Sequence, residues 1–146
     1  MRLLFKFLSL PTYKKILLIK AAFLLTIMRL VIFLVPLKSI KRLVEELLII
    51  KSMVKQDTGQ LEIKWAVDAA SNYITFTKTC LVKSLAMHIL LIRNGFESTL
   101  NIGVTKDKSE KLGAHAWVES NGKVLIANTM QKQTYTKLLS IQGRAK

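Results

Sequence analysis

A run of twenty mostly apolar residues, ILLIKAAFLLTIMRLVIFLV from Ile16 to Val35, limits the folds open to this chain more than any other feature. A helix of this length is long enough to cross a bilayer, and only Lys20, Thr26 and Arg29 interrupt it. An arginine at the centre of a spanning helix costs roughly 3 kcal/mol, and each aliphatic side chain offsets a few tenths of a kcal/mol. The run therefore predicts a helix that is either covered by protein or in contact with a membrane.

Two prolines set the limits of this first helix. Pro11 stands at its expected start and Pro36 at its end. Residues 37–54 continue as a second helix, because their apolar side chains recur at helical spacing. Residues 1–60 are therefore predicted to form an apolar helical hairpin, and the polar stretch KQDTGQ at its end has the composition of a linker.

The second domain is predicted to span residues 61–146. It should begin with a short helix over 63–70, with Trp65 facing the core. A length of 146 residues leaves room for one modest domain and an appendage.

The cysteine count and the N-terminus indicate the compartment. One cysteine cannot form an internal disulfide, and one cysteine with two histidines argues against a dedicated zinc site. Thiol chemistry in a reducing compartment is the natural setting, and no metal or organic cofactor is implied. The apolar N-terminal stretches carry interspersed lysines and no small-residue cleavage pattern follows them, so a signal peptide is not expected. These features predict a cytoplasmic protein, with membrane contact through 16–35 left open.

The net charge of +14 narrows the class of partner. The charge is spread along the chain, with no arginine-rich helix, aromatic-rich basic strand or zinc-finger spacing. Nucleic acid is therefore not an expected partner, and an anionic membrane face is the stronger candidate.

Cys80 is predicted to lie at the first turn of a helix over residues 80–94. Gly95 gives the stop signal for this helix, and Thr79 is the expected N-cap. Unpaired N–H groups and the positive end of the helix dipole favour a thiolate at such a position. His88 lies about 12 Å further along the same helix, so it is interpreted as a core residue and not as the base for Cys80.

Three segments alternate like strands, namely residues 100–104, 114–119 and 123–128. Asn121 and Gly122 join the last two, because a type I′ turn needs positive φ at both central residues. With this turn, 120 pairs with 123 and 119 with 124, and an unbroken register would place His115 opposite Asn128. The fold class is therefore α+β, with a cysteine-bearing helix packed on a small antiparallel sheet.

These elements predict a thiol active site. Cys80 is the candidate nucleophile, His115 the base and Asn128 the group that orients the imidazole. Trp117 and Glu119 share the face of His115 in a regular strand, so they either line a substrate groove or serve as core packing and a solvated strand end.

Several segments together resemble a known family. They are Trp65-Ala66-Val67, Thr79-Cys80-Leu81, Ser84-Leu85-Ala86, Leu90-Leu91, Gly95, Leu100-Asn101-Ile102-Gly103-Val104, Ala114-His115-Ala116-Trp117-Val118-Glu119 and Gly122. This set is similar to the stand-alone leader peptidase of bacterial lasso-peptide biosynthesis, which has a transglutaminase-like, papain-like cysteine-protease core. The apolar N-terminal sixty residues also resemble that family.

The resemblance implies a specific activity. Cys80 would attack the bond between leader and core of a ribosomal precursor peptide, with His115 as base and then acid. A small leader-binding protein would deliver the precursor, and a separate ATP-dependent macrolactam cyclase would close the freed core. The third position often holds Asp in relatives, whereas Asn128 offers an amide, as papain-like enzymes do; a lower rate would follow from the missing carboxylate.

Two other functions stay open on the sequence alone. A thioester at Cys80 can be resolved by an amine instead of water, which would make the chain an acyltransferase on the same fold. A non-enzymatic, membrane-associated scaffold of a biosynthetic complex, with Cys80 merely buried, is the other.

Overall fold

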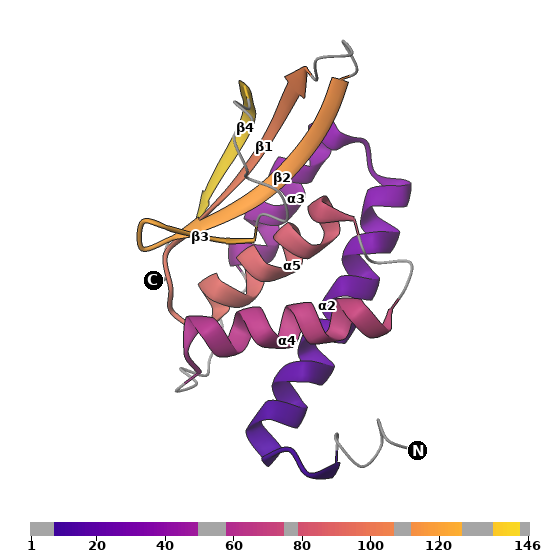
Figure 1. The fold of residues 1–146 in the computed structure, drawn as a ribbon. Helices are drawn as coiled ribbons and strands as arrows, with labels where there is room; N and C mark the ends of the chain where they lie inside the picture. Colours follow the sequence, from indigo (N-terminus) through magenta and orange to yellow (C-terminus); the bar gives the residue numbers. More distant parts are fainter. Residues whose placement is uncertain (1–7, 50–57, 75–78, 107–111, 127–135, 144–146) are drawn as a thin grey trace.

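The computed structural model describes residues 8–49, 58–74, 79–106, 112–126 and 136–143. Within these ranges, helices come first and strands follow (Figure 1). They are α2 (Thr12–Leu34), α3 (Leu37–Ile49), α4 (Gln60–Tyr73), α5 (Cys80–Arg93), β1 (Ser98–Lys106), β2 (Leu112–Ser120), β3 (Lys123–Ile126) and β4 (Thr136–Gly143). The predicted α+β class is confirmed.

Helix α5 is the centre of the core. Ten of its residues from Val82 to Ile92 are buried, on all sides of the helix. Such a helix needs neighbours all round, and it has them: the sheet covers one side, and α2, α3 and α4 cover the others (Figure 1).

Helix α5 ends at the predicted glycine. Gly95 has φ +88°, in the left-handed region that favours glycine. The N–H of Phe96 donates to the carbonyl of Leu91 at 3.0 Å, and the N–H of Gly95 donates to that of Ile92 at 3.1 Å. This is a Schellman ending, and it turns the chain from α5 into β1.

The sheet has the order β3-β2-β1-β4, with antiparallel neighbours throughout. Leu100, Val118 and Ile141 pair across β1, β2 and β4 and join the helical core. Strand β4 was not predicted from the sequence. Its apolar residues Leu138 and Leu139 are adjacent in the sequence, which breaks period-two alternation. The pairing of β4 with β1 shifts at this point, so that Ile102 pairs with Leu139 and Gly103 with Lys137.

The predicted turn is present, and the register beyond it differs from the expectation. Asn121 and Gly122 have φ of +50° and +71°, and Ser120 pairs with Lys123 as expected. The register then shifts between Glu119 and Val118, so that Val118 pairs with Ile126 instead of residue 125. The assumption of an unbroken register was wrong, because a β-bulge inserts one extra residue in β3.

The two N-terminal helices are part of the same core. Helix α2 packs on α4 and α5, while α3 packs on α5 and β4, so the two contact the rest of the protein more than each other. Their buried residues join those of α5 in one hydrophobic cluster, among them Leu17, Leu25, Met28, Ile40 and Val44. The division into 1–60 and 61–146 stays a prediction about sequence organisation, with both parts sharing one core.

Helix α4 is longer than predicted, and one of its side chains points the other way. Trp65 is exposed, contrary to the expectation that it faces the core. The ammonium group of Lys14 lies 5.8 Å from the centre of its ring, and Tyr13 of α2 donates to Glu62 at 3.0 Å. Trp65 therefore belongs to a surface cluster between α2 and α4.

Candidate active site

Cys80 is the first residue of α5 and is partly exposed. Thr79 occupies the N-cap position as predicted, but its hydroxyl makes no capping hydrogen bond. The N–H groups of the first helical turn are therefore not taken up by the Thr79 side chain. Such groups can stabilise a thiolate or the oxyanion of an acyl intermediate.

Two contacts fix the start of α5 beside β2 and α4. Ser84, one turn after Cys80, donates its hydroxyl to the carbonyl of Ala116 at 3.0 Å. On the other side, the Nζ of Lys83 lies 2.8 Å from a carboxylate oxygen of Asp68 on α4. Partial burial raises the pKa of Asp68, and hydrogen bonds from Lys64 and Lys83 outweigh it, so that this pKa lies below its usual value.

The bond from Ser84 shows where α5 begins relative to the sheet. A strand carbonyl lies close to the plane of its sheet, so a donor reaches it from the strand's edge. Among the described residues, β3 pairs with β2 at Val118, Glu119 and Ser120. The bond therefore places Ser84, one turn after Cys80, against Ala116, the neighbour of His115 in the sequence.

His115 lies on the face of the sheet that points away from the helical core. Val118 points into that core, so alternation sends His115 and Trp117 to the opposite face. The rings of His115 and Trp117 share this face, since they are stacked with centroids 6.5 Å apart and planes at 15°.

Burial lowers the pKa of His115 below its ordinary value. The imidazole is therefore neutral at neutral pH, the state in which it can accept a proton from a thiol.

Asn128, the predicted orienting residue, lies outside the described residues. Its predicted pairing with His115 rested on a regular register, and the bulge in β3 interrupts that register before Asn128 is reached. Its role stays a prediction.

Trp117 and Glu119 lie on the His115 face, as predicted. Trp117 is 2% exposed, and its indole N–H donates to the Glu119 carboxylate at 2.8 Å. The ammonium group of Lys137 on β4 lies 3.8 Å from the same carboxylate and 5.8 Å from the centre of the indole ring. Trp117 therefore packs and holds neighbouring groups in place, whereas Glu119 is partly exposed.

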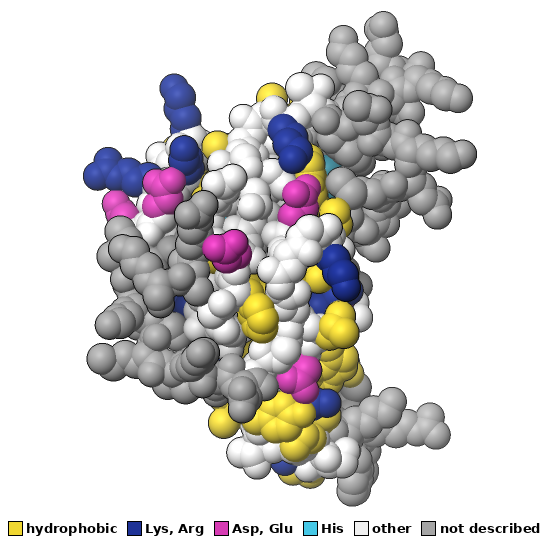
Figure 2. Space-filling model, turned by 90° about the vertical axis from the view of Figure 1, so that its left-hand side faces the viewer, with side chains coloured by type: hydrophobic (Ala, Val, Ile, Leu, Met, Phe, Trp, Pro, Cys, Tyr) yellow, Lys and Arg dark blue, Asp and Glu magenta, His cyan; other side chains and the backbone are white. Residues whose placement is uncertain are grey.

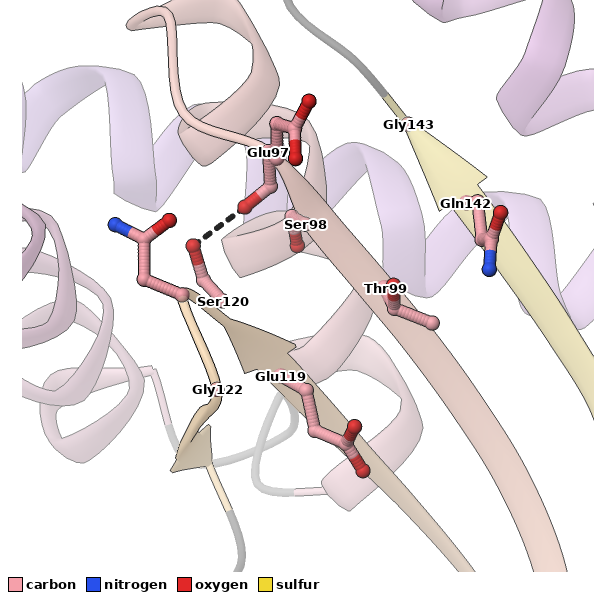
Figure 3. A pocket seen from close by; sticks show the side chains of 9 residues that line it. Glu97, Ser98, Thr99, Glu119, Ser120, Gly122, Gln142 and Gly143 are labelled. Carbon is pink, nitrogen blue, oxygen red and sulfur yellow. Dashed lines mark hydrogen bonds between the residues drawn. The ribbon is translucent and has the colours of Figure 1, made fainter.

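A polar cleft of about 290 Å³ lies further along the same strands (Figure 3). Glu119, Thr99 and Gln142 pair across β2, β1 and β4 and form one row of polar side chains there. The hydroxyl of Ser120 donates to the Glu97 carbonyl at the end of the cleft. Neither Cys80 nor His115 lines this cleft, so it is separate from the candidate catalytic pair.

His88 is the core residue that the sequence predicted. It has no exposed surface, and its Nδ1 lies 2.9 Å from the Ser98 hydroxyl at the start of β1. Burial lowers its pKa to about 4. Among the described residues, no group of three or more His, Cys, Asp and Glu side chains is arranged to hold a metal ion.

Comparison with known proteins assigns the family. A model of the transglutaminase-like superfamily matches residues 28–140, which covers α5, β1 and β2 together with Cys80 and His115. The chain belongs to the transglutaminase-like superfamily. Searches of curated proteins and of solved structures found no match. Membership of this superfamily supports a general class of activity, that of the cysteine peptidases and acyltransferases.

The Ser84 bond should matter to the stability of this transglutaminase-like domain. Ser84→Ala is expected to lower the free energy of unfolding by about 1 to 2 kcal/mol, because it removes a buried donor that joins α5 to β2. Ser71→Ala is a matched control, since Ser71 is also buried but its hydroxyl donates to the carbonyl of Asp68 in its own helix, and a loss of about 0.5 kcal/mol or less is expected. Urea denaturation measures both, and equal losses would contradict the assignment.

Gly103 should be intolerant of a side chain. A Cβ there would lie 2.9 Å from the carbonyl oxygen of Thr136 and 3.1 Å from the Trp117 ring that stacks on His115. Gly103→Ala is therefore expected to destabilise the protein by about 1 to 3 kcal/mol and to change its tryptophan emission. Gly59→Ala is the control, because nothing lies within 4 Å of its added Cβ, and a change below about 1 kcal/mol is expected. If Gly103→Ala leaves the free energy of unfolding unchanged, β4 moves away from the added Cβ at no energetic cost.

Proposed function

We propose that this chain is a cysteine peptidase that removes the leader from a lasso-peptide precursor and frees the N-terminus of the core for macrolactam formation. The observation that carries the proposal is the hydrogen bond from Ser84, one turn after Cys80, to the carbonyl of Ala116, the neighbour of His115 in the sequence. Membership of the transglutaminase-like superfamily supports thiol chemistry at such a site. The Thr79-Cys80-Leu81 and His115-Ala116-Trp117-Val118-Glu119 motifs support the finer assignment.

In this proposal Cys80 attacks the carbonyl of the bond between leader and core. His115 accepts the thiol proton and then donates it to the departing amine, which leaves an acyl-thioester on Cys80. Water resolves the thioester, and first-turn amides of α5 stabilise the oxyanion. Asn128 would orient the imidazole. A cytoplasmic location, a small leader-binding protein and an ATP-dependent cyclase as partners belong to the same proposal.

The test is mass spectrometry of a candidate precursor incubated with this protein and its leader-binding partner. One cut at the junction of leader and core is expected, with a free amine on the core. The cut should be absent with Cys80→Ala and reduced with Asn128→Ala. An intact precursor under conditions in which an active homologue cuts would overturn the proposal. A leader joined to an added amine would favour the acyltransferase instead, because water and amines compete for the same thioester.

A further inference from the structure

Helix α2 has two apolar faces, and only one of them is covered. Leu17, Ala21, Leu25 and Met28 are buried against the rest of the protein. The opposite side carries a set of exposed apolar side chains, Ile16, Ile19, Phe23, Leu30, Phe33 and Leu34, which we call the outer stripe. At about 100° per residue, the middle of this stripe lies about 180° from the middle of the buried face.

The exposure of the outer stripe is large. Phe23 is 67% exposed and Phe33 is 85% exposed, ten residues apart on the same side of the helix. A helix of 23 residues is about 35 Å long, so the stripe runs along much of one side of the molecule. Scattered apolar residues are ordinary on a protein surface, whereas six exposed apolar side chains on one side of one helix mark an interaction site.

The packing of the buried face excludes a membrane-spanning position for α2. Helix α2 is long and apolar enough to cross a membrane by length and composition. A helix that spans a bilayer is surrounded by lipid or by other membrane helices, whereas α2 packs on α4 and α5 of the folded domain. Spanning would remove Leu25 and Met28 from the core, where neither has any exposed surface. The helix can therefore lie on a membrane but not cross it in this fold.

The charges around the outer stripe fit an anionic surface. Lys20 lies on one side of the stripe, and Lys15 and Arg29 lie on the other, at about 60° to 100° from its middle. The whole of residues 1–44 contains no acid. It contains the basic residues Arg2, Lys6, Lys14, Lys15, Lys20, Arg29, Lys38, Lys41 and Arg42.

This pattern differs from that of an ordinary protein interface. An apolar stripe bordered by cations on both long sides suits a surface whose interior is apolar and whose headgroups are anionic, since long basic side chains reach up to the phosphates. Figure 2 shows hydrophobic side chains gathered at the lower end of the molecule, the level of the first half of α2 in Figure 1, with basic and acidic side chains beside them.

We propose that the outer stripe docks this protein in the plane of an anionic bilayer surface. The first half of α2 projects beyond the domain, and the sheet lies across α5 from α2 (Figure 1). A protein docked in this way presents the sheet, with His115, to the side away from the lipid. A soluble precursor and a delivery partner could then reach the site without crossing the membrane surface.

Flotation of the full-length protein with vesicles tests the proposal. With vesicles of phosphatidylcholine containing about one third phosphatidylglycerol, we expect the protein to float with the lipid. Pure phosphatidylcholine vesicles should bind at least about tenfold less, and added salt should weaken the binding to the anionic vesicles. Alkaline carbonate should release the bound protein. Equal binding to both lipids, or resistance to carbonate, would overturn in-plane docking on an anionic surface.

Paired variants locate the contact. Phe23→Gln with Phe33→Gln is expected to lower binding at least about tenfold, because the two largest side chains of the stripe no longer enter the lipid. Leu138→Gln is the control, since Leu138 is 65% exposed on β4 and lies outside the stripe, and no change is expected. An equal loss with Leu138→Gln, or none with the Phe pair, would overturn the assignment.

Self-association of the protein through the outer stripe is the outcome that would replace membrane docking. Protein that does not float but elutes as a dimer, and that becomes a monomer with the Phe23 and Phe33 changes, would assign the stripe to a second copy of the chain. Flotation needs neither a precursor nor a catalytic thiol, and Cys80→Ala should float like the wild type. Failure of the docking proposal and failure of the proposed peptidase are therefore observed separately.

Discussion

Cys80→Ala is expected to reduce precursor cleavage by a factor on the order of 10⁴ or more, because the attacking thiol is removed and water must replace it. The protein itself should stay folded. Cys80 is partly exposed at the first turn of α5, where loss of one sulfur atom changes the free energy of unfolding by about 1 kcal/mol or less. Single-turnover cleavage followed by mass spectrometry measures the rate, and urea denaturation measures the stability.

A second variant tests whether Cys80 and His115 act together in cleavage or contribute to the rate independently. His115→Gln should also slow cleavage strongly, by about 10² to 10⁴, since the neutral imidazole is the proposed base. The double variant should be no slower than Cys80→Ala alone, because a base has no role once its nucleophile is gone. Effects that multiply in the double variant would mean that His115 and Cys80 contribute independently, and a Cys80→Ala protein that still cuts would remove Cys80 from the mechanism.

The stability of the protein is expected to fall by about 3 kcal/mol between pH 6.5 and pH 4 through His88 alone. Burial lowers the pKa of this residue to about 4, whereas the unfolded chain has the ordinary value near 6.5. Between these two values the unfolded state binds a proton that the folded state does not, so stability is lost as the pH falls. Above pH 6.5 both states are neutral and the full contribution of this group is present.

A matched variant isolates the contribution of His88 from that of the carboxylates. His88→Gln keeps a polar side chain near Ser98 and cannot titrate, although it should be less stable at pH 7. The difference in unfolding free energy between pH 7 and pH 4.5 should be smaller in the variant by about 2 kcal/mol. Urea denaturation monitored by tryptophan fluorescence gives both values. Parallel pH profiles for the two proteins would mean that His88 is not buried in its neutral form.

Features that depend on a few neighbouring residues were predicted correctly. The type I′ turn at Asn121 and Gly122 and the Schellman ending at Gly95 need positive φ, which glycine and asparagine tolerate. The start of α5 at Cys80 also agrees with the prediction. Local sterics and hydrogen bonding decide such features, so the chemistry of a few residues is sufficient to place them.

Features that depend on distant pairing were not predicted. The bulge that shifts Val118 onto Ile126 is invisible in the pattern of either strand, and it interrupts the register used to place Asn128. Strand β4 was missed because it lies against β1, almost forty residues earlier in the chain, and its own alternation is weak. Both outcomes reflect the geometry of strands brought together by the whole fold.

The sequence by itself determined that this chain has an apolar N-terminal helix, a central helix that begins at Cys80, and a hairpin that carries His115. Each follows from hydrophobic period, helix ends or turn chemistry, which act over short stretches of chain. Only the tertiary structure decided which face of α2 is covered, that His115 lies on the outer face of the sheet, and that Ser84 of α5 bonds to Ala116 of β2. The reason is that burial and strand edges are properties of neighbours in space, and the sequence lists neighbours only along the chain.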